Sequence, residues 1–588
     1  MDTLPKTATI LILLTALVCG CHNGEQLTAK VRNEAGQLEE TRLREFQYCE
    51  IIPKQSFFSH RHTGDYCFLH DWGEAPEIGW KKPYFVEQVM GKIPLTVRWF
   101  DSELNEVAVG GDKPGRYGVV VEGTTADGIH IRRGLTIYRS KELFPFLIGY
   151  GHHDIYVDYL PQSGIDRDVW DQQKDTIASW AGDEFLSSLY DRPAGAIFMS
   201  YLAEAKLHAP KPAKTDTPRI RNHEYHLALK RKLMDVEDKC PPLKMPRKIN
   251  GKPAPILHAG TLKEAGVKPD TAGMIRDVCN KWYAETGEPF VVLVARRGVI
   301  VIHEAFGQAN QRNPVELDTP MMMASVTKTL TGLMFAQFIE QGLIAIDEPV
   351  GKYLPDFPVE GDQAITFRHC FTHTAGFDGH FKWGSIDNPY FENVVANGLA
   401  YYPKPGTRFE YDGIGYNLVG KVMEVVGGKS ALRLMQENFF GPLSMHNTAM
   451  DDMGALTMST AEDMAKVGQL LLNKGSYGDL EFFSPETFEQ LLPLSLRELY
   501  GIDTDEVRGI GLEWWLQQLH PDAGKGGIPT DKTILSRRVV GHGAGSGAVF
   551  GVDLENELVI VQAREWPAKD YEKYLSQFLM AIAEGLEN

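Results

Sequence analysis

Basic residues are in short supply in this chain of 588 residues. Lysine and arginine number 60 against 78 aspartates and glutamates, which gives a formal net charge of −18. General binding to nucleic acid depends on clustered lysines and arginines that neutralise phosphates. The charge balance therefore excludes that class of function, and we expect no nucleic-acid partner.

Long apolar runs are also lacking. After residue 18, no stretch holds the roughly eighteen uninterrupted apolar residues that a membrane-spanning helix needs. The one early run, Ala8 to Val18 after Lys6, is shorter than a comfortable span and is typical of a signal-peptide core. It ends in Val18-Cys19-Gly20-Cys21, which resembles a bacterial lipobox. Residues 1–21 are therefore predicted to be a lipoprotein-type signal, with Cys21 as the lipidated residue.

A plain secretory signal cut near the same place is the alternative. Either interpretation predicts an exported protein on the periplasmic or cell-envelope face, and the lipobox adds a lipid anchor to the membrane.

Cysteine is scarce outside this segment, with only five of the seven remaining. Disulfides are possible in an exported protein, and Cys49 with Cys67 or Cys240 with Cys279 stay open as pairs. Cys370 lies in an apolar context and is predicted to be a buried thiol.

Several familiar catalytic and metal-binding motifs are absent. No Gly-x-Ser-x-Gly occurs, because Ser546 has Ala544 where the first glycine should be, and this excludes the α/β-hydrolase pattern. His369 and His373 are four residues apart but no glutamate follows the first, so this is not a His-Glu-x-x-His zinc helix. A second group of possible metal ligands matches no standard zinc spacing: His60, His62, Cys67 and His70. We expect no metal site.

The chain divides near residue 250. Residues 240–255 are rich in proline and lysine without apolar periodicity, which predicts a linker. Residues 22–239 form a region of no family that we can name, with strand-like runs between 90 and 140 and a helical pattern between 165 and 235. Residues 256–588 are predicted to be a separate domain. It opens with two strand-like runs, Phe290 to Ala295 and Val299 to His303, joined by a tight turn.

Ser325 is the only serine with a lysine three residues later, in Ser325-Val326-Thr327-Lys328. A long apolar helical stretch begins there and ends near Gly342. Positions i and i+3 share a helix face, so the Lys328 ammonium can lie beside the Ser325 hydroxyl. A neighbouring basic group can take the hydroxyl proton, and the helix amino end offers N–H groups to an oxyanion. About one Ser-x-x-Lys pattern is expected by chance in a chain of this length. The interpretation of Ser325 as a nucleophile therefore depends on companion motifs.

Those companions follow in order. They are Thr372-His373-Thr374-Ala375-Gly376, Pro405-Gly406-Thr407-Arg408-Phe409-Glu410-Tyr411 leading to Gly415-Tyr416-Asn417-Leu418, Leu456-Thr457-Met458-Ser459, and Gly541-His542-Gly543-Ala544-Gly545. With Ser-Val-Thr-Lys, this set resembles the serine β-lactamase-like superfamily, in the branch of class C β-lactamases, D-Ala-D-Ala carboxypeptidases and esterases. The resemblance covers roughly residues 255 to 585. It implies an α+β fold, an antiparallel sheet flanked by helices with a mainly helical subdomain.

The resemblance also implies roles. Ser325 would be the nucleophile, and Lys328 would hold positive charge, or a free lone pair, between Ser325 and Tyr411. Tyr411 would be the family tyrosine; a phenol is ordinarily too weak an acid to serve as a base at neutral pH, and an adjacent cation favours the phenolate. His542 would stand where relatives carry the lysine of Lys-Thr-Gly, with Gly543 and Ala544 on the substrate strand. The oxyanion would meet the N–H groups of Ser325 and Gly545. Relatives carry the turn around His369 and His373 as structure, and the resemblance implies no cofactor.

Two departures from the family pattern bear on the substrate. Tyr411-Asp412-Gly413 replaces the usual Tyr-x-Asn, and Ala544 replaces a glycine. Both changes weaken the case for β-lactam or peptide hydrolysis more than for ester hydrolysis. We expect an envelope serine hydrolase that forms an acyl-serine on carboxyl esters or on small-molecule or peptidoglycan-derived substrates. The alternatives are a D-Ala-D-Ala carboxypeptidase or β-lactamase, and a non-catalytic protein that binds penicillin or cell-wall fragments.

Overall fold

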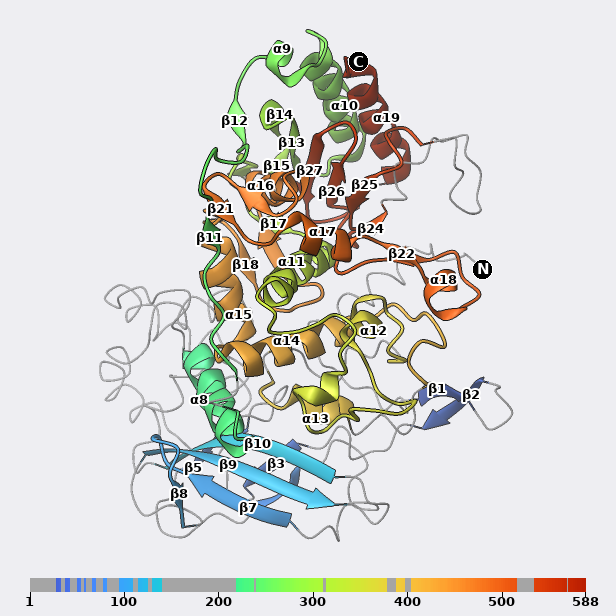
Figure 1. Ribbon diagram of the computed structural model, residues 1–588. Coiled ribbons are helices and arrows are strands. Elements are labelled where there is room, and N and C mark those ends of the chain that lie inside the picture. Colours follow the sequence, from blue (N-terminus) through green and yellow to red (C-terminus); the bar gives the residue numbers. More distant parts are fainter. Residues whose placement is uncertain are drawn as a thin grey trace, which may run out of the picture. The chain divides into compact units, whose positions relative to one another are not determined.

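The computed structural model divides the chain into two compact units (Figure 1). It describes strands within residues 28–139, then residues 218–236 and 240–587 apart from 310–312, 378–385, 387, 397–402, 515–532 and 568. The N-terminal unit comprises residues 1–212 together with 377–403, and the C-terminal unit comprises residues 213–376 and 404–588. Cys21, His60, His62 and His70 lie outside the described residues.

A nine-stranded sheet organises the C-terminal unit. Its strand order is β12-β14-β13-β27-β26-β25-β24-β23-β22. The strands are β12 (His258–Ala259), β13 (Phe290–Arg296), β14 (Val299–Phe306), β22 (Leu494–Ser495), β23 (Val507–Arg508), β24 (Glu513–Trp514), β25 (Val539–Gly541), β26 (Val549–Asp553) and β27 (Leu558–Arg564). Arg297 and Gly298 both have positive φ and form the tight turn between β13 and β14. The predicted hairpin is therefore confirmed.

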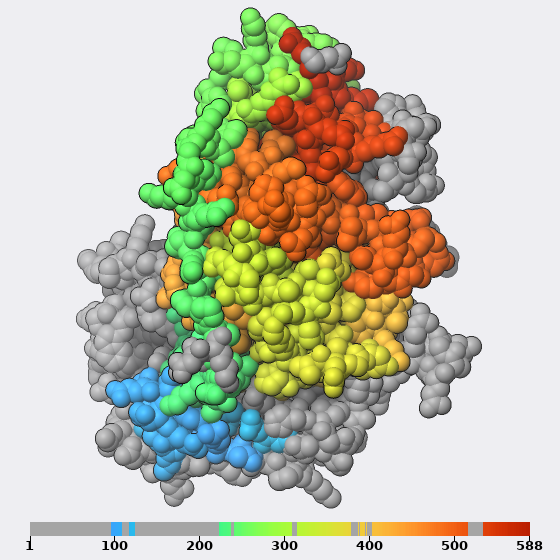
Figure 2. Space-filling view, in the orientation of Figure 1, coloured from blue at the N-terminus to red at the C-terminus, as the bar shows by residue number. Residues whose placement is uncertain are grey.

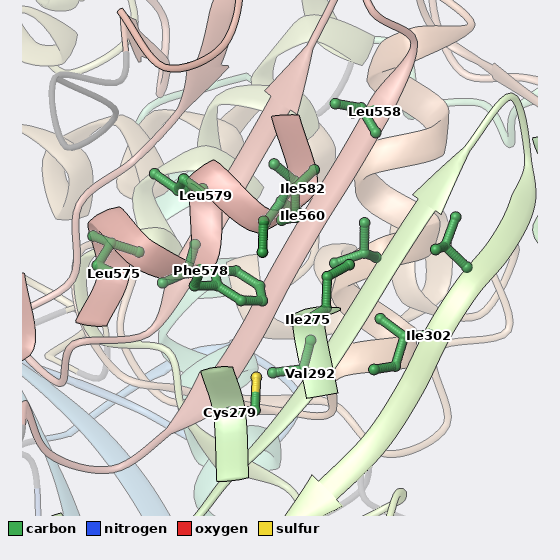
Figure 3. Close-up of a cluster of buried hydrophobic side chains, with 14 of the residues drawn as sticks. Ile275, Cys279, Val292, Ile302, Leu558, Ile560, Leu575, Phe578, Leu579 and Ile582 are labelled. Atoms are coloured by element: carbon green, nitrogen blue, oxygen red, sulfur yellow. The ribbon is translucent and has the colours of Figure 1, made fainter. Parts of the chain in front are cut away.

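Helices cover both faces of this sheet, which is why β13 and β27 are buried along their whole length. The packing of α10 (Thr271–Thr286) and α19 (Tyr571–Gly585) against the sheet forms a core that includes Ile275, Val292, Ile560 and Phe578 (Figure 3). Burial of each large side chain of this kind contributes about 1.5–3 kcal/mol. Cys279 lies in this core as a free thiol, and Cys240 is also free, so the possible Cys240–Cys279 disulfide is not formed. The other possible pair includes Cys49, which lies outside the described residues. Cys370 is a buried free thiol, as predicted.

The opposite face is covered by α16 (Ala461–Leu472). A Cβ on Gly468 would lie 2.4 Å from a methyl of Val559 on β27, so this glycine sets how closely the helix approaches the sheet. Beyond α16 lies a mainly helical part. Its helices are α8 (Pro218–Leu233), α11 (Thr327–Glu340), α12 (Phe367–Phe371), α14 (Ile414–Gly427), α15 (Ala431–Met435), α17 (Pro485–Leu491) and α18 (Leu496–Tyr500). The predicted α+β fold is confirmed for this unit.

The segment of residues 240–255 lies along the C-terminal unit (Figure 2, green). Its strand β11 (Arg247–Lys248) pairs with β21 (Leu480–Glu481), which also pairs with β20 (Ser476–Tyr477). Further backbone bonds join Ile249 N to Asp479 O and Ala254 N to Gly478 O. The helix α8 before it is held to α14 by His223, whose Nε2 lies 2.8 Å from Glu424. The separation of a domain beginning at residue 256 stays a prediction.

The N-terminal unit contains a six-stranded sheet of order β4-β5-β10-β9-β7-β8. The described strands of this unit, in and outside that sheet, are β1 (Thr28–Arg32), β2 (Leu38–Arg42), β3 (Glu50–Pro53), β4 (Phe58–Ser59), β5 (Tyr66–Leu69), β6 (Ile78–Lys81), β7 (Leu95–Phe100), β8 (Glu106–Val107), β9 (Gly115–Thr124) and β10 (His130–Arg139). The strand-like runs at 95–100 and 117–121 fall in β7 and β9, as predicted. From the later part of the chain, α13 (Phe391–Ala396) packs against β10 within the same unit.

Candidate active site

Ser325 lies in a turn that is fixed before the helix begins. The 3₁₀ turn Ala324–Val326 leads directly into α11, and Ala324 has a φ of 44°, a conformation that side chains other than glycine rarely adopt. The turn is anchored to β19 (Thr457–Ser459), because Met323 N donates to Thr457 O at 2.8 Å. The Thr327 hydroxyl donates to Ala324 O and lies 2.8 Å from the hydroxyl of Thr457. The local strain is thus held by contacts more than a hundred residues away.

Lys328 is buried in the first turn of α11 and reaches back to Ser325. Its Nζ lies 3.5 Å from the Ser325 Oγ and donates to Gly454 O at 2.7 Å. The same Nζ lies 4.7 Å from the centre of the Tyr411 ring and 5.4 Å from that of Tyr416. The predicted spatial pairing of Ser325 and Lys328 is present, and the structure brings Tyr411 to the same ammonium.

Tyr411 is exposed at the surface, although the residue after it is buried. Its side chain is 42% exposed, whereas Asp412 is 2% exposed. The ring packs against His373, with 4.4 Å between ring centres, and lies 6.3 Å from the ring of His542. The Tyr411 ring therefore lies among the Lys328 ammonium and the imidazoles of His373 and His542.

A loop that the sequence did not single out holds Lys328 in place. Asn417 on α14 donates to Asp452 Oδ2 at 2.7 Å and accepts from Met453 N at 3.2 Å. The other oxygen of Asp452 accepts from the N–H groups of Gly454 and Ala455. Burial raises the pKa of Asp452, and these hydrogen bonds oppose the rise. Asn417 belongs to a quoted motif, but neither it nor Asp452 carries a local signal of this role, because their partners are distant in the sequence.

His542 follows strand β25, and among the described residues its polar contacts involve only the ring nitrogen Nδ1. Its Nδ1 lies 2.7 Å from Gly543 O; a carbonyl only accepts, so Nδ1 carries the proton and Nε2 holds the lone pair. The Gly543 N–H donates to Glu513 Oε1 at 2.8 Å, and Glu513 pairs with Arg508. Burial, followed by the charge of Lys328, holds the pKa of His542 well below its usual range. His542 is therefore a neutral imidazole.

The substrate strand continues from Gly543 through Ala544 to Gly545. Gly545 is exposed, whereas Gly543 and Ala544 are half-buried. The Gly543 N–H is already engaged by Glu513 and is not free for a ligand. Among the described residues, nothing lies within 4 Å of the position that a Cβ on Gly545 would take, so space is open beside it.

The turn that contains His369 and His373 is part of the fold. His369 completes a capping box at the start of α12, accepting from Thr366 N at its Nδ1. Burial lowers the pKa of His369 to about 4. Within the described residues, no cluster of three or more histidine, cysteine, aspartate or glutamate side chains could hold a metal ion.

The sheet, its covering helices and the Ser325-Lys328-Tyr411 grouping define the class of a β-lactamase-like α+β domain. Residues 289–563 match the family model described as Beta-lactamase, and this part of the chain is a domain of that family. Among the described residues, no helix has both the length and the apolar character needed to cross a membrane.

Several curated proteins are similar to this chain. Penicillin-binding protein 4* of Bacillus subtilis is 27% identical over 168 residues, which is 27% of this chain and 37% of that protein. Monacolin J acid methylbutanoyltransferase of Aspergillus terreus is 29% identical over 226 residues, or 32% of this chain and 53% of that protein. A putative D-alanyl-D-alanine carboxypeptidase of Escherichia coli is 21% identical over 400 residues, or 53% and 86%. The first two relatives are thus matched over little more than a third and about half of their length.

Solved structures are similar over about half of the chain. EstCE1, a hydrolase with promiscuous acyltransferase activity, aligns with a TM-score of 0.43 and 19% identity, covering 53% of this chain and 98% of that one. A family VIII carboxylesterase aligns with a TM-score of 0.43 and 19% identity, covering 53% and 96%.

Proposed function

We propose that this protein is a serine hydrolase that acts through an acyl-enzyme on Ser325. The observation that carries the proposal is the position of Lys328, whose Nζ lies 3.5 Å from the Ser325 Oγ and 4.7 Å from the centre of the Tyr411 ring. One ammonium beside a hydroxyl and a phenol lowers the cost of removing a proton from either. The Beta-lactamase family match over residues 289–563 supports the same assignment.

In the proposed reaction, the Ser325 oxygen attacks the substrate carbonyl while its proton passes to Tyr411, assisted by Lys328. The N–H groups of Ser325 and Gly545 hold the oxyanion of the tetrahedral intermediate. The proton then leaves with the alcohol of an ester. Water attacks the acyl-serine in the same manner, which releases the acid and restores Ser325. No metal or organic cofactor enters this scheme.

Carboxyl esters are the substrates that we propose first. An amide leaving group needs more help than an alcohol, and the chain has Gly413 where relatives of the amide- and β-lactam-cleaving type carry an asparagine. His542 is a neutral imidazole with its N–H bonded to Gly543 O, so it offers no cation to a substrate carboxylate. Small acyl esters and peptidoglycan-derived acyl compounds without a free carboxylate at that position fit this site.

We also propose that the protein works on the periplasmic or envelope face, anchored through a lipid on Cys21. The support is the sequence of the first 21 residues alone. Metabolic labelling with a fatty-acid analogue should mark the parent protein and not a Cys21→Ser variant. Equal labelling of the parent and the variant would contradict lipidation at Cys21.

The nucleophile is tested by intact-protein mass. A fluorophosphonate should add one reagent mass to the folded protein, and Ser325→Ala should abolish both labelling and ester turnover. Ser102→Ala, at an exposed serine of the N-terminal unit, is the matched control and should keep both. Labelling that persists in Ser325→Ala would refute the assignment. A stable penicillin adduct without turnover of any ester would favour the binding-protein alternative.

Acyl transfer is a second candidate, because an acyl-serine can react with an alcohol as well as with water. Its support is the similarity to Monacolin J acid methylbutanoyltransferase, which is 29% identical over 226 residues. Added glycerol or methanol should then divert the acyl group from acid to a new ester, measured as the product ratio. A product that stays entirely acid at high alcohol concentration would exclude this candidate.

A further inference from the structure

His373 makes contact with the chain on both sides of Tyr411. Its carbonyl oxygen accepts from Glu410 N at 2.9 Å, and its Nδ1 accepts from Asp412 N at 3.1 Å. Its ring packs on the Tyr411 ring with 4.4 Å between centres. The backbone N–H groups of the residues just before and just after the exposed tyrosine are thus bonded to one buried residue, which also packs against the face of the tyrosine ring.

The backbone at His373 is held in an uncommon conformation. His373 has a φ of 57°, in the left-handed region that few residues other than glycine and asparagine adopt. Strain of this kind persists only where the surroundings enforce it. Here the following residues are bonded as well: Thr374 N donates to His369 O, and Gly406 N donates to Thr374 O at 2.7 Å. The turn is therefore a rigid support placed directly behind the strand-like segment that carries Tyr411.

The hydrogen bond to Asp412 requires a neutral imidazole. Nδ1 accepts, so the proton is on Nε2, and a second proton on Nδ1 would break the bond. The groups that face this ring are Lys328 on α11, Arg508 on β23, Asp412 with an oxygen at 3.7 Å, Tyr411, Tyr416 on α14 and His542. Burial, followed by the charges of Lys328 and Arg508, holds the pKa of His373 well below its usual range. The ring stays neutral at physiological pH, and the bond to Asp412 is kept.

We propose that His373 is the positioning residue of the Tyr411 base: it holds the backbone N–H groups of the residues on either side of Tyr411 and one face of its ring, so that the ring stays beside the Lys328 ammonium. This inference rests on the proposed function, in which Tyr411 accepts the Ser325 proton. It gives His373 a role in turnover that goes beyond support of the turn. A small displacement of a catalytic group costs rate without a comparable loss of substrate binding.

Two substitutions separate the side-chain hydrogen bond from the backbone conformation. His373→Asn and His373→Gly both tolerate a positive φ, but only asparagine offers an oxygen close to the place of Nδ1. With an activated ester, and with rates divided by the active fraction from fluorophosphonate titration, His373→Gly should lower kcat roughly tenfold or more with little change in KM. His373→Asn should recover most of that loss. Equal kcat values for the two variants would overturn the proposal, whatever their melting temperatures.

The same substitutions in a Tyr411→Phe background decide whether His373 acts through the phenol. Tyr411→Phe alone should lower kcat roughly a hundredfold, and adding His373→Gly should then change kcat less than about twofold. A further tenfold loss in the double variant would show an independent action and overturn the positioning role. A Tyr411→Phe enzyme with full kcat would instead contradict the base assigned in the proposed function. The two failures are therefore distinguishable.

Discussion

Lys328 and Asp412, two buried charged residues near Ser325, are held by different kinds of contact. Lys328 is held by a carbonyl oxygen, Gly454 O, and by the faces of two tyrosine rings. A carbonyl and ring faces favour a cation without neutralising it, so the ammonium keeps its effect on Ser325 and Tyr411. Asp412, next to Tyr411, is one of two buried acids near Lys328, and its carboxylate accepts from Gly415 N at the start of α14.

The charge of Asp412 should make stability depend on pH. Burial raises its pKa from 3.8 to about 6. Between these values the folded protein holds a proton that the unfolded chain has released, so the contribution to stability is greatest below pH 4 and is lost as the pH rises through 6. Asp412→Asn, which can still cap α14, should therefore raise the free energy of unfolding at pH 7.5, by up to about 3 kcal/mol, and by less at pH 5.

Urea denaturation at the two pH values measures this difference. Asp451→Asn, at an exposed aspartate, is the control and should show no such pH-dependent gain. A gain of equal size at pH 5 and pH 7.5 would mean that the carboxylate charge is not the cause.

Gly413 is the position at which the missing amide can be restored. Its φ of −105° is accessible to any residue, and it is the residue that precedes α14, where asparagine is favoured. Gly413→Asn should raise acylation by a penicillin or a D-Ala-D-Ala peptide relative to a p-nitrophenyl ester about tenfold, the effect of one added hydrogen bond to a charged group. Acylation rates measured with each substrate give this ratio. A folded variant with an unchanged ratio would place the specificity elsewhere, with His542 as the next candidate.

At the scale of elements, three chain segments meet at Lys328. The amino end of α11 carries Ser325 and Lys328, the residues before α14 carry Tyr411, and the loop of residues 452–455 supplies Gly454 O. Asn417 on α14 is the side chain that joins the second segment to the third. The active-site geometry therefore depends on the attachment of this loop to α14.

Asn417→Ala should weaken that attachment. The change removes the bonds to Asp452 Oδ2 and from Met453 N and leaves a buried carboxylate with fewer donors. We expect a loss of about 2–4 kcal/mol in the free energy of unfolding and a lower kcat, because Gly454 O no longer fixes Lys328. Asn473→Ala at the end of α16, where the side chain also bonds to carbonyl oxygens, is the control. It should lower stability and leave kcat unchanged; equal kcat in both variants would contradict the link to Lys328.

At the scale of the whole molecule, the chain passes from the C-terminal unit to the N-terminal unit and back. It leaves after Gly376, three residues beyond His373, and returns at Lys404, seven residues before Tyr411. The two ends are joined by the bond from Gly406 N to Thr374 O. Within the N-terminal unit, the inserted segment is fixed by Tyr390, which is 1% exposed and lies against Gly134 on β10.

Gly134→Leu should release that inserted segment. A Cβ at this position would lie 1.9 Å from the Tyr390 ring, so a larger side chain must displace the ring. We expect limited chymotrypsin digestion, read by mass, to cut the full-length variant within residues 377–403 much faster than the parent. Gly273→Leu, at a glycine with no atom within 4 Å of the added Cβ, is the control and should digest like the parent. Identical cleavage of both variants would mean that Tyr390 does not hold the segment.

Local patterns in the sequence were sufficient for the hairpin of residues 290–306, the helix after Ser325 and the strands at 95–100 and 117–121. Each depends on periodicity or on neighbours within a few residues, and the order of motifs indicated the family domain that the match to residues 289–563 shows. The pairing of Ser325 with Lys328 followed from i, i+3 spacing for the same reason. The signal, the lipidation of Cys21 and the domain boundaries stay predictions.

Other features were decided only by the tertiary structure. The bond from Lys328 to Gly454 O spans 126 residues, and the bond from Asp412 N to His373 Nδ1 spans 39. The protonated nitrogen of His542 depends on a backbone carbonyl. Residues 377–403 join strands that precede them by more than two hundred residues. Such contacts exist because burial brings distant groups together and then requires each buried polar atom to find a partner, and the partner carries no mark in the local sequence.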